Sequence, residues 1–477
     1  MSEAAISLKD DPTEVVTRFA PNPNGPLTVG HVRGVVVNYH LTRKYGGRFI
    51  LRYDDTDPRT KKPLKEAYKW IVEDCEWLGC PPDEVVTASE NMLSYYEMAE
   101  KVLESGDAYV CTCEQRAFKT MKDQGIACQC RDLDVEENMS RWKRMFDDFP
   151  EGGAVLRVKT DIKHPDPALR DWVGFRIVDE PHPLTGDEYR VWPLLDFESA
   201  VEDHARGVTH IIRGKDLMDS GLKQKYLYKH LGWDYPEVIL WGRIRIEGVG
   251  KFSSSRMSEE IASGKYAGWD DPALPTLRAL KRRGISAKTL RDFMLSLGLH
   301  ESAVKISMEN IYAENRKNLD EATNRYFFIP DPVKLFVEGI PGKTVRMPLH
   351  PGFKQRGTRD WCMQDGTCLY IPGKDAKLSK DEIVKLMGLP CIAVDSVGDD
   401  GVRAHYMPGQ HKKTRKIQCV QDFIECTILK PDGVDEGYCE PEVENLQAGT
   451  IVQFERYGFC RLDSKEGERL TFVYGHK

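Results

Sequence analysis

The sequence has no long hydrophobic run. None of its apolar stretches approaches the roughly 20 residues that a membrane-spanning helix needs. The opening residues carry Lys9, Asp10, Asp11 and Glu14, where a secretory signal would be apolar. These two absences predict a protein that is not bound to a membrane and that works in the cytoplasm.

Cysteine is scarce for the length of the chain. Thirteen cysteines in 477 residues are too few for a disulfide scaffold, and the expected location predicts reduced thiols. A cluster of cysteines is therefore first a metal candidate. Four of them form two CxC pairs that could surround a tetrahedral structural Zn²⁺: Cys111, Cys113, Cys128 and Cys130. The alternative is that these reduced cysteines pack in a small core.

The chain also lacks an excess of positive charge. Its formal net charge is -7, with 30% charged residues, which excludes a uniformly basic protein that coats nucleic acid. Two local clusters, 278–291 and 411–416, are basic. Each could meet RNA phosphates or could be an ordinary solvated face, so the overall charge does not decide the partner.

Strand and helix patterns alternate in the first hundred residues. Residues 15–19 and 49–53 read as strands, and 31–45 and 62–78 have apolar residues at helical spacing. A third helix is expected from Ser89, as its N-cap, to Leu103. This βαβα order predicts a parallel sheet that binds ligands at the carboxyl ends of its strands.

Changes in this pattern predict several domains, in line with about 150 residues per domain. Cysteines, prolines and short strands interrupt the α/β alternation, and short alternating runs broken by Gly and Pro follow Pro330. The expected segments are an N-terminal extension at 1–13, a Rossmann-type nucleotide-binding domain split into 14–108 and 191–250, an insertion at 109–190, a loop with a helical subdomain at 251–330, and a β-barrel region at 331–477.

The loop after the first strand ends in Thr28-Val29-Gly30-His31, where a helix begins. A helix N-terminus offers unpaired N–H groups and the positive end of a dipole, so it suits a phosphate. His31 could donate a hydrogen bond to that phosphate. Taken alone, the four residues fit a helix cap with a partly buried histidine better than a phosphate site.

Longer blocks carry a family resemblance. Residues 18–31 read RFAPNPNGPLTVGH and residues 51–58 read LRYDDTDP, and further blocks follow in order at 194–199, 207–214, 268–276, 282–285, 331–335 and 452–459. Together they resemble the class I glutamyl- and glutaminyl-tRNA synthetases. Thr28 stands where many members have the first histidine of the HIGH signature, and His31 matches its last position.

The resemblance implies an α/β fold in which the insertion binds the tRNA acceptor end and the barrel binds the anticodon. It implies catalytic roles for Thr28, His31, Ser253 and Arg256. It implies that ATP, with Mg²⁺, contacts Asn22, Pro23, Asn24, Val29, Gly30, His31, Gly34, Gly214, Arg243, Ile244, Ser253, Ser254 and Ser255. It also implies that the amino acid contacts Arg18, Asp54, Leu195, Ser199 and Arg213.

The second signature loop departs from the family pattern. Residues 251–256 read KFSSSR, so Ser254 replaces the second lysine of KMSKS. Members of the archaeal-like branch place their basic residue where Arg256 stands, so Arg256 is expected to supply the charge. The alternative is a flexible surface loop.

The expected substrate depends on Arg213. Glutamyl enzymes carry arginine at this position, whereas glutaminyl enzymes usually carry an uncharged residue, and arginine matches a carboxylate. The resemblance therefore indicates a glutamate–tRNA ligase that uses L-glutamate and tRNA(Glu), and it leaves tRNA(Gln) open as a second substrate. The alternatives are a glutaminyl-tRNA synthetase and a non-catalytic tRNA-binding paralogue. Leu195, where many members have tyrosine, removes a hydroxyl from the expected pocket.

Overall fold

The computed structural model describes residues 6–8, 12–242, 244–247, 253–409, 414–467 and 469–477. The chain divides into two compact units, one made of Met1–Ser263 with Leu290–Ser307 and the other of Gly264–Thr289 with Met308–Lys477. The expected segment 251–330 is thus shared between the two units. Among the described residues, no helix is long and apolar enough to span a membrane.

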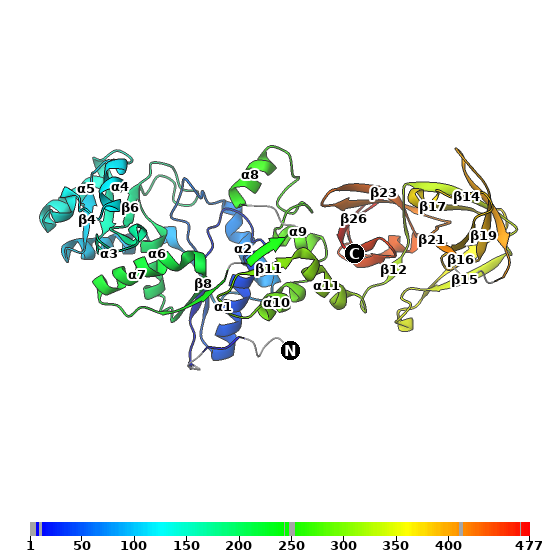
Figure 1. Ribbon diagram of the computed structural model, residues 1–477, viewed down its shortest axis with the longest axis horizontal. Coiled ribbons are helices and arrows are strands. Elements are labelled where there is room, and N and C mark those ends of the chain that lie inside the picture. Colours follow the sequence, from blue (N-terminus) through cyan, green and yellow to red (C-terminus); the bar gives the residue numbers. More distant parts are fainter. Residues whose placement is uncertain (1–5, 9–11, 243, 248–252, 410–413, 468) are drawn as a thin grey trace. The chain divides into compact units, whose positions relative to one another are not determined.

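The first unit alternates helices and strands at both ends and carries an antiparallel sheet between them (Figure 1). Its elements before this sheet are β1 (Thr17–Phe19), α1 (Val32–Tyr45), β2 (Phe49–Tyr53), α2 (Lys65–Trp77), β3 (Glu84–Thr87) and α3 (Met92–Glu104). Those after it are α6 (Leu195–Ala205), β8 (His210–Gly214), α7 (Met218–Leu231), β9 (Glu237–Trp241), β10 (Ile244–Glu247), α8 (Ser254–Ala262) and β11 (Val304–Ser307), with α10 (Ala287–Ser296) crossing the unit boundary.

The two halves of the nucleotide-binding fold meet at β1. Strands β1, β2 and β3 pair in parallel, and so do β8 and β9. Backbone N–H groups of Thr209 and His210 donate to the carbonyl of Val16, which places β8 beside β1. Two segments separated by about 190 residues therefore form one side-by-side set of strands, as an insertion within a single domain requires.

The insertion is a four-stranded antiparallel sheet in the order β4-β5-β6-β7. Its elements are β4 (Ala108–Cys111), α4 (Gln115–Asp123), α5 (Val135–Asp147), β5 (Val155–Val158), β6 (Val173–Ile177) and β7 (Val191–Pro193). The sheet thus extends to Pro193, three residues beyond the expected end. Trp142, Phe175 and Trp192 pack with α3, α6 and α7 in one buried cluster, so the insertion shares a core with the helices that flank it.

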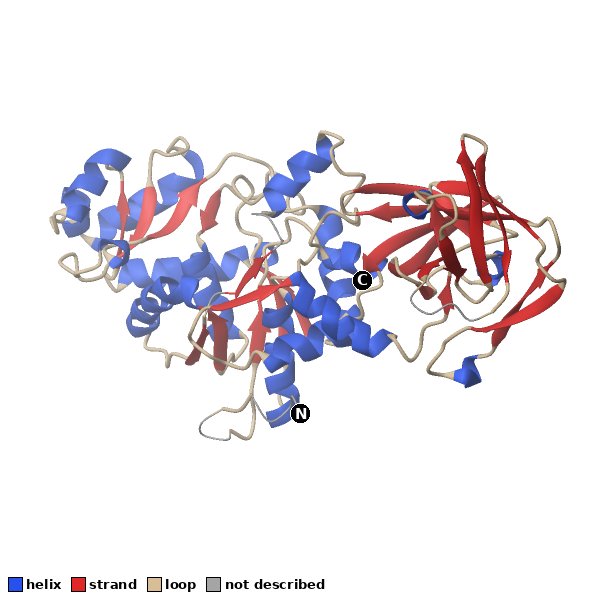
Figure 2. Cartoon of the chain, turned by 45° about the vertical axis from the view of Figure 1, so that its right-hand side comes forward, coloured by secondary structure: helices blue, strands red, loops and turns tan. Residues whose placement is uncertain are grey.

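The second unit joins short helices to a region that is almost entirely strands (Figure 2). The helices include α9 (Leu277–Arg282) and α11 (Met308–Leu319). Seven strands form one barrel-like sheet: β12 (Arg325–Tyr326), β13 (Phe328–Pro330), β22 (Ile424–Lys430), β23 (Gly433–Cys439), β24 (Ile451–Phe454), β25 (Gly458–Glu466) and β26 (Arg469–His476). Six form a second: β14 (Pro332–Glu338), β17 (Cys368–Pro372), β18 (Ile383–Leu386), β19 (Cys391–Gly398), β20 (Gly401–Met407) and β21 (Arg415–Ile417); β15 (Lys343–Pro348) and β16 (Thr358–Met363) pair separately.

One disulfide corrects the expectation of reduced thiols. Cys426 and Cys439 lie on the adjacent antiparallel strands β22 and β23, inside one buried cluster, and they are bonded. Sequence spacing did not reveal this pair because the register of the two strands brings the side chains together. The other eleven cysteines are free, and Cys75 and Cys80 are buried, as expected of core residues.

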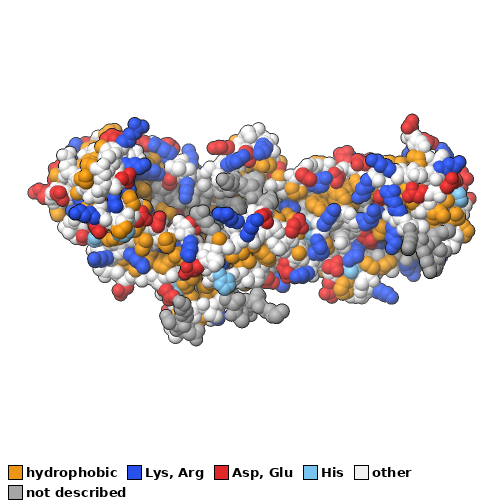
Figure 3. Space-filling model, in the orientation of Figure 1, with side chains coloured by type: hydrophobic (Ala, Val, Ile, Leu, Met, Phe, Trp, Pro, Cys, Tyr) orange, Lys and Arg blue, Asp and Glu red, His pale blue; other side chains and the backbone are white. Residues whose placement is uncertain are grey.

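The surface carries charges of both signs. On the face shown in Figure 3, Lys and Arg are interspersed with Asp and Glu over each unit. Within the basic cluster at 278–291, Arg282 pairs with Asp463 at 2.7 Å, and buried Arg283 donates to the carbonyl oxygen of Tyr474 at 3.2 Å. These two arginines therefore have partners inside the second unit. In the other cluster, residues 411–413 lie outside the described part of the chain.

Candidate active site

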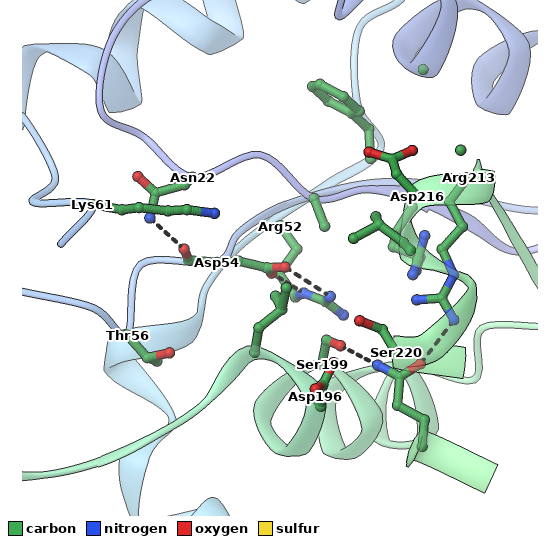
Figure 4. Close-up of a pocket in the computed structure, with 18 of the residues that line it drawn as sticks. Asn22, Arg52, Asp54, Thr56, Lys61, Asp196, Ser199, Arg213, Asp216 and Ser220 are labelled. Atoms are coloured by element: carbon green, nitrogen blue, oxygen red, sulfur yellow. Dashed lines mark hydrogen bonds and ion pairs between the residues drawn. The ribbon is translucent and has the colours of Figure 1, made fainter. Parts of the chain in front are cut away.

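A cavity of about 650 Å³ opens at the carboxyl ends of the parallel strands of the first unit. Its wall includes Phe19 at the end of β1, Asp54 directly after β2, and Arg213 near the end of β8. Of the predicted site residues, ten line it: Arg18, Asn22, Gly30, His31, Gly34, Asp54, Leu195, Ser199, Arg213 and Gly214. Sequence blocks far apart in the chain thus form one site (Figure 4).

Local packing explains why the first helix ends at this cavity. A Cβ atom at Gly34 would lie 3.1 Å from the ring of Phe19, so glycine lets α1 pack closely against the end of β1. Asn22 donates from Nδ2 to the backbone oxygen of Asp54 at 2.9 Å, which ties the loop after β1 to the end of β2. Loop, helix start and second strand are therefore held together around one opening.

His31 stands immediately before α1 with a defined ring orientation. The backbone N–H of Thr28 donates to His31 Nδ1 at 3.1 Å, so in the neutral ring the remaining N–H lies on Nε2. Burial lowers the pKa of His31 to about 4, so the ring is neutral at pH 7. A neutral imidazole with one free N–H can donate to a phosphate oxygen in the cavity but does not bring a positive charge.

The floor of the cavity is a buried network of charges. Arg18 donates to Asp203 at 2.9 Å, Arg52 donates to Asp203 and to Asp54 at 2.6 Å each, and Glu198 lies 3.5 Å from Arg52. Burial opposes ionisation of Asp203, yet Arg18 and Arg52 hold the pKa of this carboxyl below its usual range. Arg18 therefore forms a buried salt bridge with Asp203.

Arg213 differs from Arg18 in its partners. Its Nη2 atom donates to Gln224 Oε1 at 3.1 Å and to the Tyr235 hydroxyl at 3.2 Å, both of which are neutral groups. Among the described residues no carboxylate forms an ion pair with it, and its buried Nε has no hydrogen-bond partner. The charge of Asp203 attracts Arg213 from a distance, but burial lowers the pKa of Arg213 overall. A buried cation without a directly paired carboxylate is costly, so this site suits an anionic ligand.

Asp54 also belongs to the buried network of charges. Its carboxylate receives the Arg52 hydrogen bond described above, and burial raises the pKa of Asp54 against the opposing effect of Arg52. Figure 4 shows Asp54 and Arg213 on facing sides of the cavity, with Ser199 of α6 between them. A ligand with an amino group at one end and a carboxylate at the other could span these two groups.

The remaining predicted residues lie outside the cavity wall. Pro23, Asn24, Thr28, Val29 and Ile244 are close to it in sequence but do not line it, and Arg243 lies outside the described residues. In the second signature loop, Lys251 and Phe252 are also outside the described part.

The second signature begins a helix in this structure. Ser253 caps α8 by accepting the backbone N–H of Arg256 at 3.3 Å, and Ser254 and Ser255 form the first turn. Arg256 is exposed and pairs with Glu260 at 3.1 Å. The expected phosphate contacts of Ser253, Ser254, Ser255 and Arg256 are therefore not formed within the cavity as it stands.

Sequence reasoning missed several residues that shape the site. Arg52 could have been found, because a charged residue in the middle of the apolar strand Phe49–Tyr53 must have a buried partner. Gln224 and Tyr235 gave no signal, since a helical glutamine and a loop tyrosine are ordinary in those positions. Other wall residues not singled out are Thr56, Asp57, Lys61, Arg176, Asp196, Asp216, Leu217, Ser220 and Trp241.

The two CxC pairs converge in the insertion. Sγ atoms of Cys111 and Cys128 are 4.0 Å apart, those of Cys113 and Cys130 are 3.8 Å apart, and all four lie within 4.8 Å of one another without a disulfide. The expected convergence is thus confirmed. Four thiolates at this spacing would fit tetrahedral Zn²⁺, and Arg141, whose Nη1 lies 3.5 Å from the Cys130 sulfur, would offset part of their negative charge.

Comparisons with known proteins agree with this geometry. Residues 14–321 match the family described as tRNA synthetases class I (E and Q), catalytic domain. Residues 323–407 and 410–463 match two families described as tRNA synthetases class I (E and Q), anti-codon binding domain.

Named relatives match over nearly the whole chain. A glutamate--tRNA ligase of Methanothrix thermoacetophila is 49% identical and one of Methanocella arvoryzae is 48% identical, each match covering 97% of this chain and 82% of the relative. A crystal structure of a glutamate tRNA ligase from Elizabethkingia meningosepticum aligns with a TM-score of 0.45 at 21% identity, covering 64% of this chain and 70% of that one. The chain belongs to the class I (E and Q) tRNA synthetases and is an aminoacyl-tRNA synthetase.

Proposed function

We propose that the chain is a glutamate–tRNA ligase that works in the cytoplasm, where tRNA is charged. The single observation that carries this proposal is Arg213, a buried cation in the cavity wall whose described partners are all neutral. The γ-carboxylate of glutamate would supply the missing counter-charge. A glutamine side chain would leave the cation unbalanced, which argues against the glutaminyl alternative.

The cavity gives each end of glutamate a partner. Asp54 would hold the α-amino group, Arg213 would bind the γ-carboxylate, and Ser199 lies between them at the cavity wall. Arg18 would contribute less to the γ-carboxylate than Arg213, because Asp203 already balances its charge at 2.9 Å. Leu195, 39% exposed at the mouth, offers no hydroxyl to the substrate.

ATP would lie along the loop after β1 and the start of α1. Gly30, Gly34 and Gly214 line the cavity there, and the Nε2–H of His31 would donate to a phosphate oxygen. Asn22, Pro23, Asn24, Thr28 and Val29 would shape that loop. Arg243, Ile244, Ser253, Ser254, Ser255 and Arg256 would contact the nucleotide after movement of the second signature loop. Mg²⁺ bound with the ATP would neutralise phosphate charge.

The reaction would proceed in two steps. An oxygen of the glutamate α-carboxylate attacks the α-phosphorus of ATP, pyrophosphate leaves, and glutamyl-adenylate forms. A hydroxyl of the terminal adenosine of tRNA(Glu) then attacks the adenylate carbonyl, and AMP leaves. Neither step needs a nucleophile from the protein, so the cavity would accelerate both steps by positioning the reactants and by electrostatic stabilisation.

The insertion would hold a structural zinc ion on Cys111, Cys113, Cys128 and Cys130. The convergence of four free thiols within 4.8 Å supports this proposal. Such an ion would fix the loop after β4 against the turn at 129–132, in a small cluster with Tyr109 and Phe118.

Glutamate-dependent exchange between ATP and pyrophosphate tests the proposal. The assay is run with glutamate or glutamine, with and without tRNA, because the resemblance implies that activation requires tRNA. We expect exchange with glutamate and at most weak exchange with glutamine. Absence of exchange under every condition, while tRNA still binds, would favour a non-catalytic paralogue. Charging transcripts of tRNA(Glu) and tRNA(Gln) side by side decides whether the second is also a substrate.

A further inference from the structure

Arg213 is held by two neutral groups on one side of the cavity. Gln224 Oε1 lies 3.1 Å from its Nη2, the Tyr235 hydroxyl lies 3.2 Å from the same nitrogen, and that hydroxyl donates to Gln224 Oε1 at 2.9 Å. The amide nitrogen of Gln224 donates to Ser199 Oγ at 2.6 Å. All polar atoms of the Gln224 side chain are therefore bonded, and the side chain is 1% exposed.

These bonds fix which way the amide faces. The oxygen must point to Arg213, because the guanidinium has donors only, and the NH₂ group must point to Ser199. The two contacts join three elements, since Ser199 lies on α6, Gln224 on α7 and Arg213 on β8. Gln224 thus orients the guanidinium with a neutral acceptor, which leaves its positive charge unbalanced.

A glycine makes room for the guanidinium on the same helix. Gly221 lies one turn before Gln224 in α7, and a Cβ atom there would sit 2.8 Å from Arg213 Nη2. Gly221 and Gln224 together form the surface against which Arg213 rests. Two residues of α7 thus determine where the Arg213 guanidinium lies: Gly221 leaves space for it and Gln224 bonds to it.

We propose that Gln224 is a positioning residue that sets the preference for an anionic amino-acid side chain, by orienting Arg213 without neutralising it. The inference rests on the proposed glutamate specificity. Its reason is the contrast with Arg18, where Asp203 both orients and neutralises the guanidinium. A carboxylate at position 224 would do the same for Arg213 and would remove the need for an anionic substrate.

The direct test is the isosteric substitution Gln224→Glu. KM for glutamate, KM for ATP and kcat are measured in aminoacylation, together with the ratio of kcat/KM for glutamine to that for glutamate. We expect KM for glutamate to rise about thirtyfold or more, since one charge-assisted contact is lost. KM for ATP should stay within about twofold, and the glutamine-to-glutamate ratio should rise about tenfold. Gln115→Glu, the same change at an exposed position of α4, is the matched control.

A second variant keeps the inference testable if Gln224→Glu does not fold. Gly221→Ala adds one methyl group against the guanidinium of Arg213 and is expected to shift the guanidinium without unfolding α7. KM for glutamate should rise while KM for ATP and the melting temperature stay close to those of the unchanged chain. If Gln224 has only a structural role, Gln224→Glu should instead lower the melting temperature and leave the KM for glutamate unaffected.

The outcomes separate the inference from the proposed function. If the unchanged chain charges tRNA with glutamate but Gln224→Glu and Gly221→Ala keep its KM for glutamate, the inference is overturned and the function stands. If the unchanged chain does not use glutamate at all, both are overturned. A raised KM for glutamate together with a raised glutamine-to-glutamate ratio supports the inference.

Discussion

Arg18 and Arg213 show how far single residues could be predicted. The family blocks correctly predicted that both lie in one cavity. Which of them is neutralised could not be predicted, because the partner of Arg18 is Asp203, 185 positions away along the chain. The partners of Arg213 depend on the side chains that α7 and the following loop present, and no local pattern encodes them.

Half-buried His31 should act as a neutral hydrogen-bond donor. Because its pKa is about 4, adenylate formation should show no inflection near pH 6.5 that belongs to this residue. His31→Ala should slow adenylate formation about 10²- to 10³-fold, as loss of one preorganised donor does elsewhere. His31→Gln keeps an N–H at similar reach and should retain part of the rate. Single-turnover measurements from pH 5.5 to 8 check this, and an inflection near pH 6.5 that His31→Gln abolishes would contradict it.

Glu198 should make the stability of the first unit depend on pH. Within the described part of the chain, neither of its carboxylate oxygens has a hydrogen bond, and its one ion-pair partner at 3.5 Å, Arg52, already donates to Asp54. Burial raises the pKa of Glu198 well above its ordinary value, and the charge of Asp54 adds to this. The protonated form is thus favoured in the fold, so stability is fully present below the unfolded pKa of about 4.3 and is lost as pH rises toward the folded pKa.

The variant Glu198→Gln imitates the protonated form at every pH. We expect its melting temperature to be close to that of the unchanged chain at pH 5 and to exceed it increasingly toward pH 8, because the slope is at most about 1.4 kcal/mol per pH unit. Thermal melting of both proteins at the same series of pH values measures this difference, and other titrating groups are common to both. A difference that stays constant with pH would show that Glu198 does not titrate in this range.

At the scale of elements, the hydrophobic periodicity predicted that a helix or strand is present better than it predicted where that element begins and ends. The strand at Phe49–Tyr53 has the expected bounds, whereas the helix expected over 62–78 covers only Lys65–Trp77. Ser89 was expected to cap the third helix, but its hydroxyl donates to Asp55 at 2.7 Å and α3 begins at Met92. A serine can cap a helix or satisfy a buried carboxylate, and only the position of β2 decides between these roles.

Removal of zinc should loosen the insertion and leave the strands of the second unit unchanged. The four thiols join the end of β4 to the turn at Gln129–Asp132. Elemental analysis should find one zinc per chain, and chelation should speed amide exchange in these two segments while the strands of the second unit keep their protection. Aminoacylation should fall because the insertion would no longer hold the acceptor end. Unchanged exchange and unchanged charging in protein verified to be free of zinc would contradict the structural role.

For the whole molecule, the order of the segments along the chain could be predicted better than which segments belong to the same compact unit. The insertion within the nucleotide-binding fold follows from alternation that stops and resumes, and β8 indeed lies beside β1. The helical stretch around 264–289 groups with the strands at the C-terminal end, because Asn315 binds both the carbonyl of Gly284 and the ring of His476. Contacts across some 160 residues of chain leave no local trace in the sequence.

Charging of tRNA(Glu) by the unchanged chain tests the central claim most directly. Labelled glutamate and labelled glutamine are each supplied with ATP, Mg²⁺ and a tRNA(Glu) transcript, and the label that becomes attached to the 3′ end is measured. The unbalanced charge of Arg213 predicts that glutamate is attached and that glutamine is attached at least about a hundredfold less efficiently. Faster charging with glutamine, or no charging with either amino acid, would contradict the account.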